Sequence, residues 1–259
     1  MNRSVDRAID IIELATQNRG GVSLRDILIK TGMPKSSAFD IVRSLVKRNI
    51  LREIPGKTTL YAPGRQLYFM GNSYPESLPI LKILIDRLQE TAEATHYNTY
   101  AGVLENDELV YAYKYKPKKS ILTAAGLGDK KPLHCTALGK VLVSFQKPDE
   151  CRRLIASLPL SRLTNYTITD REEFSREIQE CFDRGYALDI RENDDHTFCV
   201  SAPVLNNEGV AEMAVSLSYI YSENISLEKE IKIIRDIAHE LSQTLGYSGP
   251  RPGKKQGEE

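Results

Sequence analysis

The sequence predicts an α+β protein with two domains, a small helical head and a larger body in which an antiparallel sheet is flanked by helices. The chain has 259 residues and is 41% hydrophobic, which is enough to bury two cores. Its charge is also divided: residues 1–70 contain 12 Lys and Arg against 6 Asp and Glu, a balance of +6, whereas the remaining 23 against 29 give −6. A basic head on an acidic body is expected when only one domain meets a polyanion.

Three short helices are predicted in the head. The first has an apolar stripe between charged side chains, formed by Val5, Ala8, Ile9, Ile12 and Ala15. The second begins at Ser23, because Asp26 follows at the spacing of a capping box. Gly32 and Pro34 then end that helix and open the third, which covers residues 35–48. Its expected inward side chains are Ala38, Ile41, Val42 and Leu45.

The outward face of the third helix combines phosphate donors with groups able to touch base edges, as a recognition helix does. Its predicted DNA contacts are Lys35, Ser36, Ser37, Phe39, Asp40, Arg43 and Lys47. Two extended runs around Pro55-Gly56 then predict a β-hairpin, which would be a wing with Lys57 at its tip. We therefore expect a winged helix-turn-helix domain over residues 1–63 that binds double-stranded operator DNA. The alternative is a helical module that binds protein, with its basic side chains merely solvated.

A linker helix is expected over residues 64–78, with a break at Pro75 and Pro79, and the body covers residues 79–247. After a first long amphipathic helix, the predicted strands are 97–104, 109–115, 120–125, 187–190, 198–204 and 210–220. The predicted helices are 135–145, 148–157, 169–184, with a capping box from Thr169 to Glu172, and a closing helix from Leu227 to Leu245. The tail, residues 248–259, is rich in Pro, Gly, Lys and Glu, and its composition predicts disorder.

Several classes of protein are disfavoured by composition. The four cysteines, Cys135, Cys151, Cys181 and Cys199, lack the spacing of a zinc site, so we expect reduced thiols and no metal or cofactor. No apolar run approaches the roughly 18 residues that span a bilayer, and the N-terminus has no apolar signal core. We therefore expect a cytoplasmic protein without a membrane partner.

Three motifs in the body occur in a fixed order: Pro132 to Leu142 (PLHCTALGKVL), Arg184 to Asp189 (RGYALD), and Cys199 to Val204 (CVSAPV). With Pro34-Lys35-Ser36-Ser37 in the head, the sequence resembles the isocitrate-lyase-regulator (IclR) family from about residue 3 to 247. The resemblance implies a transcriptional regulator without enzymatic activity, with a winged helix-turn-helix and a GAF-like effector domain. It also implies self-association as a homodimer or tetramer.

The resemblance further implies a ligand site for a small organic, aromatic or sugar acid, at Ala137, Leu138, Asp189, Cys199, Ser216 and Ser218. The residues themselves agree with this site. Alternation along the last strand puts Ser216 and Ser218 on one face, where two hydroxyls converge. The helix that opens at Thr136 has free backbone N–H groups that favour a carboxylate. Asp189 can accept a hydrogen bond from a ligand hydroxyl, or repel a second carboxylate.

Two positions depart from the family pattern. Asp40 stands where the family often has a basic or polar residue, and an acid there can accept from cytosine or pair with Arg43 or Ser44. His196 replaces a glycine that usually lies three residues before the pocket cysteine.

Two other functions are compatible with parts of the sequence. One is an enzyme with Cys199 as nucleophile, His134 or His196 as base and Asp189 as the orienting group. The other is a winged-helix regulator whose body dimerises and binds no ligand.

Overall fold

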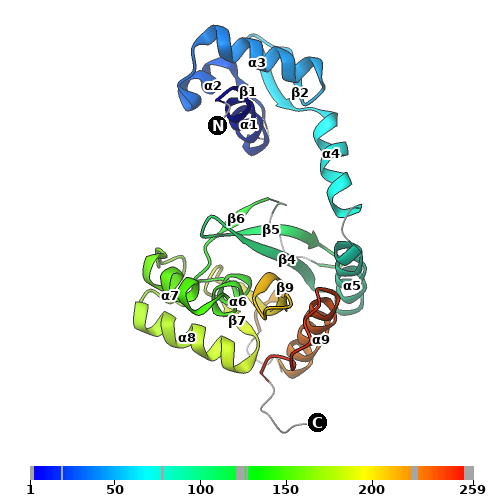
Figure 1. Ribbon diagram of the computed structural model, residues 1–259, viewed down its shortest axis with the longest axis vertical. Helices are drawn as coiled ribbons and strands as arrows, with labels where there is room; N and C mark the ends of the chain where they lie inside the picture. The colour runs from blue at the N-terminus through cyan, green and yellow to red at the C-terminus, as the bar shows by residue number, and fades with distance from the viewer. Residues whose placement is uncertain are drawn as a thin grey trace. The chain divides into compact units, whose positions relative to one another are not determined.

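The computed structural model describes residues 3–18, 20–76, 79–120, 126, 128–222 and 227–253. The chain divides into two compact units, Met1–Pro79 and Ile80–Glu259 (Figure 1). The α+β class is confirmed, because each unit contains both helices and an antiparallel sheet. The expected strand at 120–125 has all but its first residue outside the described residues.

The first unit folds around the three predicted helices. Its elements are α1 (Arg3–Gln17), β1 (Val22–Ser23), α2 (Leu24–Thr31), α3 (Lys35–Lys47), β2 (Leu51–Ile54) and β3 (Leu60–Pro63). The buried core is made of apolar side chains from all three helices and the hairpin, among them Ile11, Ile27, Val42 and Tyr61. The predicted hairpin is confirmed as the β2–β3 pair, and β1 adds a third strand that the sequence pattern does not reveal.

Local hydrogen bonds set the entry and exit of α2. The capping box is confirmed: the Asp26 N–H donates to Ser23 Oγ at 3.2 Å, and the Asp26 carboxylate accepts from the Ser23 N–H at 2.9 Å. Gly32 ends the helix with a left-handed φ of 63°, a conformation that a residue without a Cβ adopts at little cost. The turn into α3 is therefore encoded locally.

The linker helix α4 covers Arg65–Glu76, so the expected break at Pro75 is wrong in position. A proline removes a single hydrogen bond, which a helix can lose in its last turn. The next helix, α5 (Pro79–Thr95), opens at the second proline, where a proline at the first helical position is favourable.

The second unit is built on a six-stranded sheet with the order β6-β5-β4-β9-β8-β7, in which every neighbouring pair is antiparallel. The strands are β4 (Asn98–Glu105), β5 (Glu108–Tyr115), β6 (Lys130–Lys131), β7 (Ala187–Ile190), β8 (Thr197–Leu205) and β9 (Ala211–Ile220). The helices are α5, α6 (Ala137–Ser144), α7 (Pro148–Ser157), α8 (Arg171–Arg184) and α9 (Glu228–Thr244).

The two faces of the sheet are covered by different helices (Figure 1). Helices α5 and α9 lie together on one face, where Arg87 of α5 forms an ion pair with Glu240 of α9 at 2.9 Å. Helices α6, α7 and α8 cover the other face, around a core that includes Leu142, Leu154 and Phe174. The motif PLHCTALGKVL, which contains α6, therefore lies on the face of the sheet opposite to α5 and α9.

Two predictions about the body need correction. The capping residue of α8 is Asp170 and not Thr169, because Asp170 Oδ1 accepts from the Glu173 N–H at 2.8 Å. The tail is ordered further than expected, because Arg251 forms an ion pair with Asp236 of α9 at 2.6 Å and Pro252 accepts a hydrogen bond from Arg235. Residues 254–259 of the tail lie outside the described residues.

Candidate ligand pocket and nucleic-acid interface

The outward face of α3 is open to solvent. The side chains of Lys35, Ser36, Phe39, Asp40, Arg43 and Lys47 are exposed and Ser37 is half-buried. The inward residues Ala38 and Val42 are buried at 0% and 1% exposure, so the helical period separates the two faces as predicted. Phe39, on the same face, is 46% exposed.

Of the alternatives for Asp40, an ion pair with Arg43 is not formed among the described residues. Ser44 Oγ donates to the backbone oxygen of Asp40 at 2.9 Å. This hydrogen bond does not involve the carboxylate of Asp40, which is an exposed residue. Lys57 is exposed in the turn between β2 and β3, as expected for a wing tip. The eight predicted DNA contacts thus include four basic side chains and one acid.

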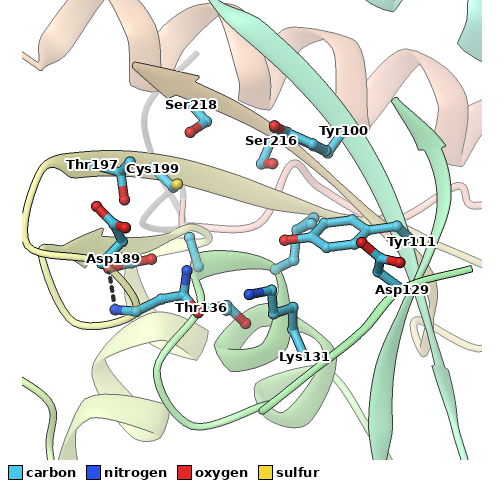
Figure 2. A pocket seen from close by; sticks show the side chains of 14 residues that line it. Tyr100, Tyr111, Asp129, Lys131, Thr136, Asp189, Thr197, Cys199, Ser216 and Ser218 are labelled. Atoms are coloured by element: carbon cyan, nitrogen blue, oxygen red, sulfur yellow. Dashed lines mark hydrogen bonds between the residues drawn. The ribbon is translucent and has the colours of Figure 1, made fainter. Parts of the chain in front are cut away.

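A cavity of about 270 Å³ opens in the second unit between the sheet and the N-terminus of α6 (Figure 2). All six residues predicted as a ligand site line it: Ala137, Leu138, Asp189, Cys199, Ser216 and Ser218. These residues are spread over more than 80 positions of the chain, and the fold brings them together. The volume is near the lower end of the range for small-molecule sites, roughly 300–1,000 Å³.

Several polar side chains that line the cavity are paired across neighbouring strands and so form rows across the sheet. Asp189 of β7 lies opposite Cys199 of β8, and Cys199 lies opposite Ser218 of β9. Ser216 lies opposite Tyr100 of β4. Residues directly opposite in an antiparallel pair point to the same face, so each row faces the cavity.

The N-terminus of α6 is held against the preceding loop by two close contacts. Thr136 Oγ1 accepts from the Gly139 N–H at 3.1 Å and donates to the Pro132 oxygen at 3.0 Å. A Cβ at Gly139 would lie 2.3 Å from the Leu133 oxygen, so only glycine permits this approach. The cap occupies the N–H of Gly139, and the first helical N–H groups, those of Ala137 and Leu138, have no partner within the helix.

Asp189 is buried in the wall of the cavity formed by β7, with 1% exposure. Its Oδ1 accepts from the backbone N–H groups of Glu192 at 2.8 Å and Asn193 at 3.3 Å. Burial, and then the neighbouring charge of Glu192, raise the pKa of Asp189 to about 7. Its second oxygen makes no hydrogen bond to any residue that the structure describes, and Figure 2 shows the carboxyl group beside Thr197 and Cys199.

The loop that carries Asn193 and Asp194 is fixed by a buried ion cluster behind the cavity. Lys140 of α6, 1% exposed, donates to the Glu192 carboxylate, to the Leu188 oxygen at 3.0 Å and to Glu177 of α8 at 3.3 Å. Glu192 and Glu177 keep Lys140 charged despite its burial and raise its pKa. Lys140, within the motif PLHCTALGKVL, is thus a structural cation that joins α6 to the wall of the pocket.

The departure at His196 has little effect on the backbone. His196 is not among the described residues with a positive φ, so no glycine is required there. The left-handed position of this loop is Arg191 at φ 67°, whose guanidinium lies over the Tyr166 ring at 4.1 Å and the Tyr221 ring at 5.1 Å. His196 is exposed and lies outside the cavity lining.

The catalytic arrangement considered from the sequence is not assembled. Burial raises the pKa of the Cys199 thiol well above its usual range, so it is not an activated nucleophile. His134 Nε2 is bonded to the Ser161 oxygen at 2.9 Å, and neither His134 nor His196 lines the cavity.

Thr136, where the sequence places the start of the carboxylate-binding helix, lines the cavity as well. The lining residues that the sequence did not indicate are Tyr100, Tyr111, Asp129, Lys131, Asn193, Asp194 and Thr197. Lys131 directly precedes the motif PLHCTALGK, and this adjacency is the signal that could have identified it. Tyr111 has no such signal, because a register shift in the β4–β5 pair decides which face it occupies.

Neither a metal site nor a membrane span is found within the ranges described above. No group of three His, Cys, Asp or Glu side chains could hold a metal ion there. No helix among those residues is long and apolar enough to cross a bilayer.

Two family models match the chain. One, described as the C-terminal domain of the bacterial transcriptional regulator IclR, matches residues 72–243, and the other, the IclR helix-turn-helix domain, matches residues 4–55. The HTH-type transcriptional regulator XynR of Escherichia coli (strain K12) is 28% identical over 247 residues, 95% of this chain and 98% of that protein.

Solved structures are similar over nearly the whole chain. The structure of Thermotoga maritima IclR is 27% identical with a TM-score of 0.73, and the match covers 95% of this chain and 100% of that one. An IclR homologue from Microbacterium hydrocarbonoxydans complexed with 4-hydroxybenzoate has a TM-score of 0.81 at 19% identity, with 94% and 99% coverage. Because its identity to this chain is only 19%, the Microbacterium structure shows that the two proteins share a fold.

Proposed function

Because this chain belongs to the IclR family of DNA-binding transcriptional regulators, which are not enzymes, we propose that a small organic acid binds its cavity and changes its affinity for an operator. The observation that carries the proposal is the convergence of Ala137, Leu138, Asp189, Cys199, Ser216 and Ser218 on one cavity. The family homologue complexed with 4-hydroxybenzoate, an aromatic acid, supports the choice of ligand class.

The acid is recognised at the N-terminus of α6. The free N–H groups of Ala137 and Leu138, together with the helix dipole, provide donors for a carboxylate. Ser216 is 2% exposed and Ser218 6% exposed, and their hydroxyls complete a polar wall on the sheet side. A buried site of this kind favours a ligand that satisfies several polar groups at once.

DNA is contacted by the exposed face of α3 and by the wing. Lys35, Arg43, Lys47 and Lys57 supply positive charge for phosphates, and Asp40, whose carboxylate has no ion pair among the described residues, is available to a cytosine amino group. We assign Ser36, Ser37 and Phe39 to the same contact surface, because they lie on the same helix face.

The chain acts as a homodimer or tetramer in this proposal. Tyr68, Phe69 and Met70 of α4 are 68%, 58% and 57% exposed, which is a costly surface for a monomer to present to water. A second copy of the chain would cover them. The dimer can adopt more than one geometry, and the effector binds one of them more tightly than the other. This difference in binding free energy shifts the dimer toward that geometry, which changes the distance between its two α3 helices and so their fit to the two half-sites.

The experiment that tests the effector pocket uses Ser216→Val and Ser218→Val in the full chain. Thermal shift of the wild type against a panel of small carboxylic acids identifies a binding acid, and gel shift on a selected operator measures its effect on DNA affinity. We expect both variants to bind operator normally and to lose at least about tenfold in effector affinity. Each substitution removes a hydroxyl donor from the cavity, and the methyl groups of valine occupy part of its volume.

The matched control is Ser222→Val, an exposed serine just beyond β9. It should leave both DNA binding and the effector response unchanged. Normal effector response in the two pocket variants would contradict the pocket. A wild type that responds to none of the acids would favour a body that dimerises without a ligand.

A further inference from the structure

The segment that follows α9 folds back onto the second unit. Its residues 248–253, which we call the strap, lie beyond residue 243, where the match to the IclR C-terminal family model ends. After α9 the chain turns back toward the end of α8 (Figure 1). The turn begins at Gly246, with a left-handed φ of 85°, and the Tyr247 hydroxyl donates to the Pro250 oxygen at 2.9 Å. The strap is thus an ordered segment outside the region that the family model covers.

One side of the strap is attached to α9 through two arginines. Arg251 forms an ion pair with Asp236 at 2.6 Å and also donates to the Lys232 oxygen at 3.3 Å. Arg235 of α9 donates in the other direction, to the Pro252 oxygen. Burial and then the nearby charge of Arg251 lower the pKa of Arg235, so the two guanidinium groups repel each other. This repulsion offsets part of the attraction that holds the strap.

The other side of the strap packs on the turn between α8 and β7. Gly185, which ends α8 with a left-handed φ of 77°, lies so close to the strap that a Cβ there would overlap the Pro252 oxygen. A Cβ at Gly253 would in turn overlap the Arg184 oxygen. Two backbone segments are therefore in direct contact, and Gly185 belongs to the motif RGYALD that leads into β7.

The strand β7 forms one wall of the ligand cavity but has little support from the sheet. It is four residues long and lies at the edge of the sheet, where β8 is its partner among the strands that the structure describes. An edge strand has a neighbour on one side only. Asp189 of β7 lines the cavity, and so do Asn193 and Asp194 of the loop that follows. The position of this wall therefore depends on contacts outside the sheet.

A series of side-chain contacts joins the same turn to the loop after β7. Arg184 donates to the Glu177 carboxylate at 2.8 Å. Glu177 also accepts from Lys140 at 3.3 Å, and Lys140 bonds the Leu188 oxygen at 3.0 Å and the carboxylate of Glu192. A movement of Arg184 would thus disturb the ion cluster that fixes the cavity wall.

From these contacts we propose that the strap is a positioning element for the cavity: when docked, it holds the α8–β7 turn, β7 and the loop to residue 194 in place, and its release loosens this wall. The proposal requires no ligand and so goes beyond the proposed effector function. The alternative is a tail that rests on the surface, in which case its removal would affect no residue of the cavity wall.

Hydrogen exchange measured by mass spectrometry tests the proposal on the full chain and two truncated chains. Truncation after Tyr247 removes the strap, whereas truncation after Gly253 is the matched control, because it keeps every contact described above. Loss of the strap should speed amide exchange over residues 185–194 at least about tenfold, because local opening of this segment becomes easier. Exchange in the central strands β4 and β9 should change by less than about twofold, and the control should match the full chain.

A single substitution tests the same contact with every other residue in place. Gly253→Ala should also speed exchange over residues 185–194, because its Cβ would overlap the Arg184 oxygen and displace the strap. The control is Gly209→Ala in the turn between β8 and β9, where φ is also 77° but the nearest atom to an added Cβ is 3.8 Å away. It carries similar backbone strain without the overlap, so exchange over residues 185–194 should remain as in the wild type.

Two outcomes would overturn the proposal. One is unchanged exchange over residues 185–194 in both the chain without a strap and Gly253→Ala. The other is faster exchange of equal size in β4 and β9, which would indicate general destabilisation of the second unit. If the chain truncated after Tyr247 does not fold, the comparison of Gly253→Ala with Gly209→Ala decides alone. Since no ligand is present in these measurements, neither outcome bears on the proposed effector function.

Discussion

Lys140 shows how one side chain can support a pocket that it does not line. Its ammonium group is buried with the carboxylates of Glu192 and Glu177, and it also bonds the Leu188 oxygen, one residue before Asp189. The buried cation has two acids and a carbonyl as partners, and its removal would leave the Glu192 carboxylate buried without a counter-charge.

Lys140→Met should therefore lower the free energy of unfolding by about 3–5 kcal/mol, because the buried Glu192 carboxylate loses its counter-charge, whereas Glu177 keeps its ion pair with Arg184 at 2.8 Å. Denaturant unfolding of the full chain measures the effect. Lys147→Met is the control, since the Lys147 ion pair with Glu208 is exposed and should contribute less than about 1 kcal/mol. Equal effects of the two substitutions would contradict a structural role for the buried cluster.

Asp189 makes stability depend on pH. Its pKa rises from the ordinary 3.8 to about 7 in the folded chain, chiefly through burial and then through Glu192, while Lys140 acts in the opposite direction. Because the folded state then holds a proton that the unfolded state has released, stability falls as pH rises between about 4 and 7.

Asp189→Asn should flatten this part of the pH profile by up to about 1.4 kcal/mol per pH unit, since the amide does not titrate. The amide oxygen can still accept from the Glu192 N–H, so the loop remains closed. Denaturant unfolding at several pH values measures both profiles. Identical slopes of the two profiles would contradict the raised pKa of Asp189.

At the scale of elements, α6 makes a close backbone contact with the loop that precedes it. The first turn of the helix packs so closely on Leu133 that a Cβ at Gly139 would lie 2.3 Å from the Leu133 oxygen. The same contact aligns the free N–H groups with the cavity and holds Pro132 beside Thr136. The geometry of the pocket depends on this one glycine.

Gly139→Ala should destabilise the second unit by more than about 3 kcal/mol or prevent folding, because two backbone segments must separate. The control is Gly71→Ala in α4, where an added Cβ meets nothing within 4 Å and alanine favours a helix by about 0.5–1 kcal/mol. Expression level and thermal unfolding compare the two. A Gly139→Ala variant as stable as the wild type would show that the helix can move away from the loop.

The whole molecule has no net charge, yet it belongs to a family that binds a polyanion. The +6 balance of residues 1–70 and the −6 balance of the rest resolve this contrast. Attraction to phosphate is then local to the head, and the acidic body limits non-specific binding by the remaining surface.

Arg43→Ala and Lys47→Ala should each weaken operator binding and lower the slope of log affinity against log salt by about 1. Fluorescence anisotropy at several salt concentrations measures both quantities. Lys30→Ala is the control, because Lys30 is exposed on α2, outside the assigned contact face. If the two α3 variants keep wild-type affinity and slope, this face does not contact DNA.

The sequence by itself determined the helices and strands whose signals are local. The capping box at Ser23, the left-handed Gly32, the hairpin around Pro55-Gly56 and the alternation along β9 each depend on residues a few positions apart. The cap of α8 was misplaced by one residue, since Thr169 and Asp170 are both good caps and only the backbone geometry selects Asp170. The six ligand residues came from the family resemblance together with the alternation, and their lining of one cavity is a property of the fold.

Only the tertiary structure decided which charged and aromatic side chains meet in the cavity. Tyr111, Tyr113 and Tyr115 alternate as if they shared one face, but the β4–β5 pair shifts register after Ala101, so that Tyr111 faces the cavity while Tyr115 donates to Glu93 of α5 at 2.6 Å. Lys140 is buried with partners 37 and 52 residues away. The spacing of hydrophobic residues indicates whether one segment is a helix or a strand. A bulge or a buried ion pair depends instead on contacts between separate elements, and those contacts exist only once the chain has folded.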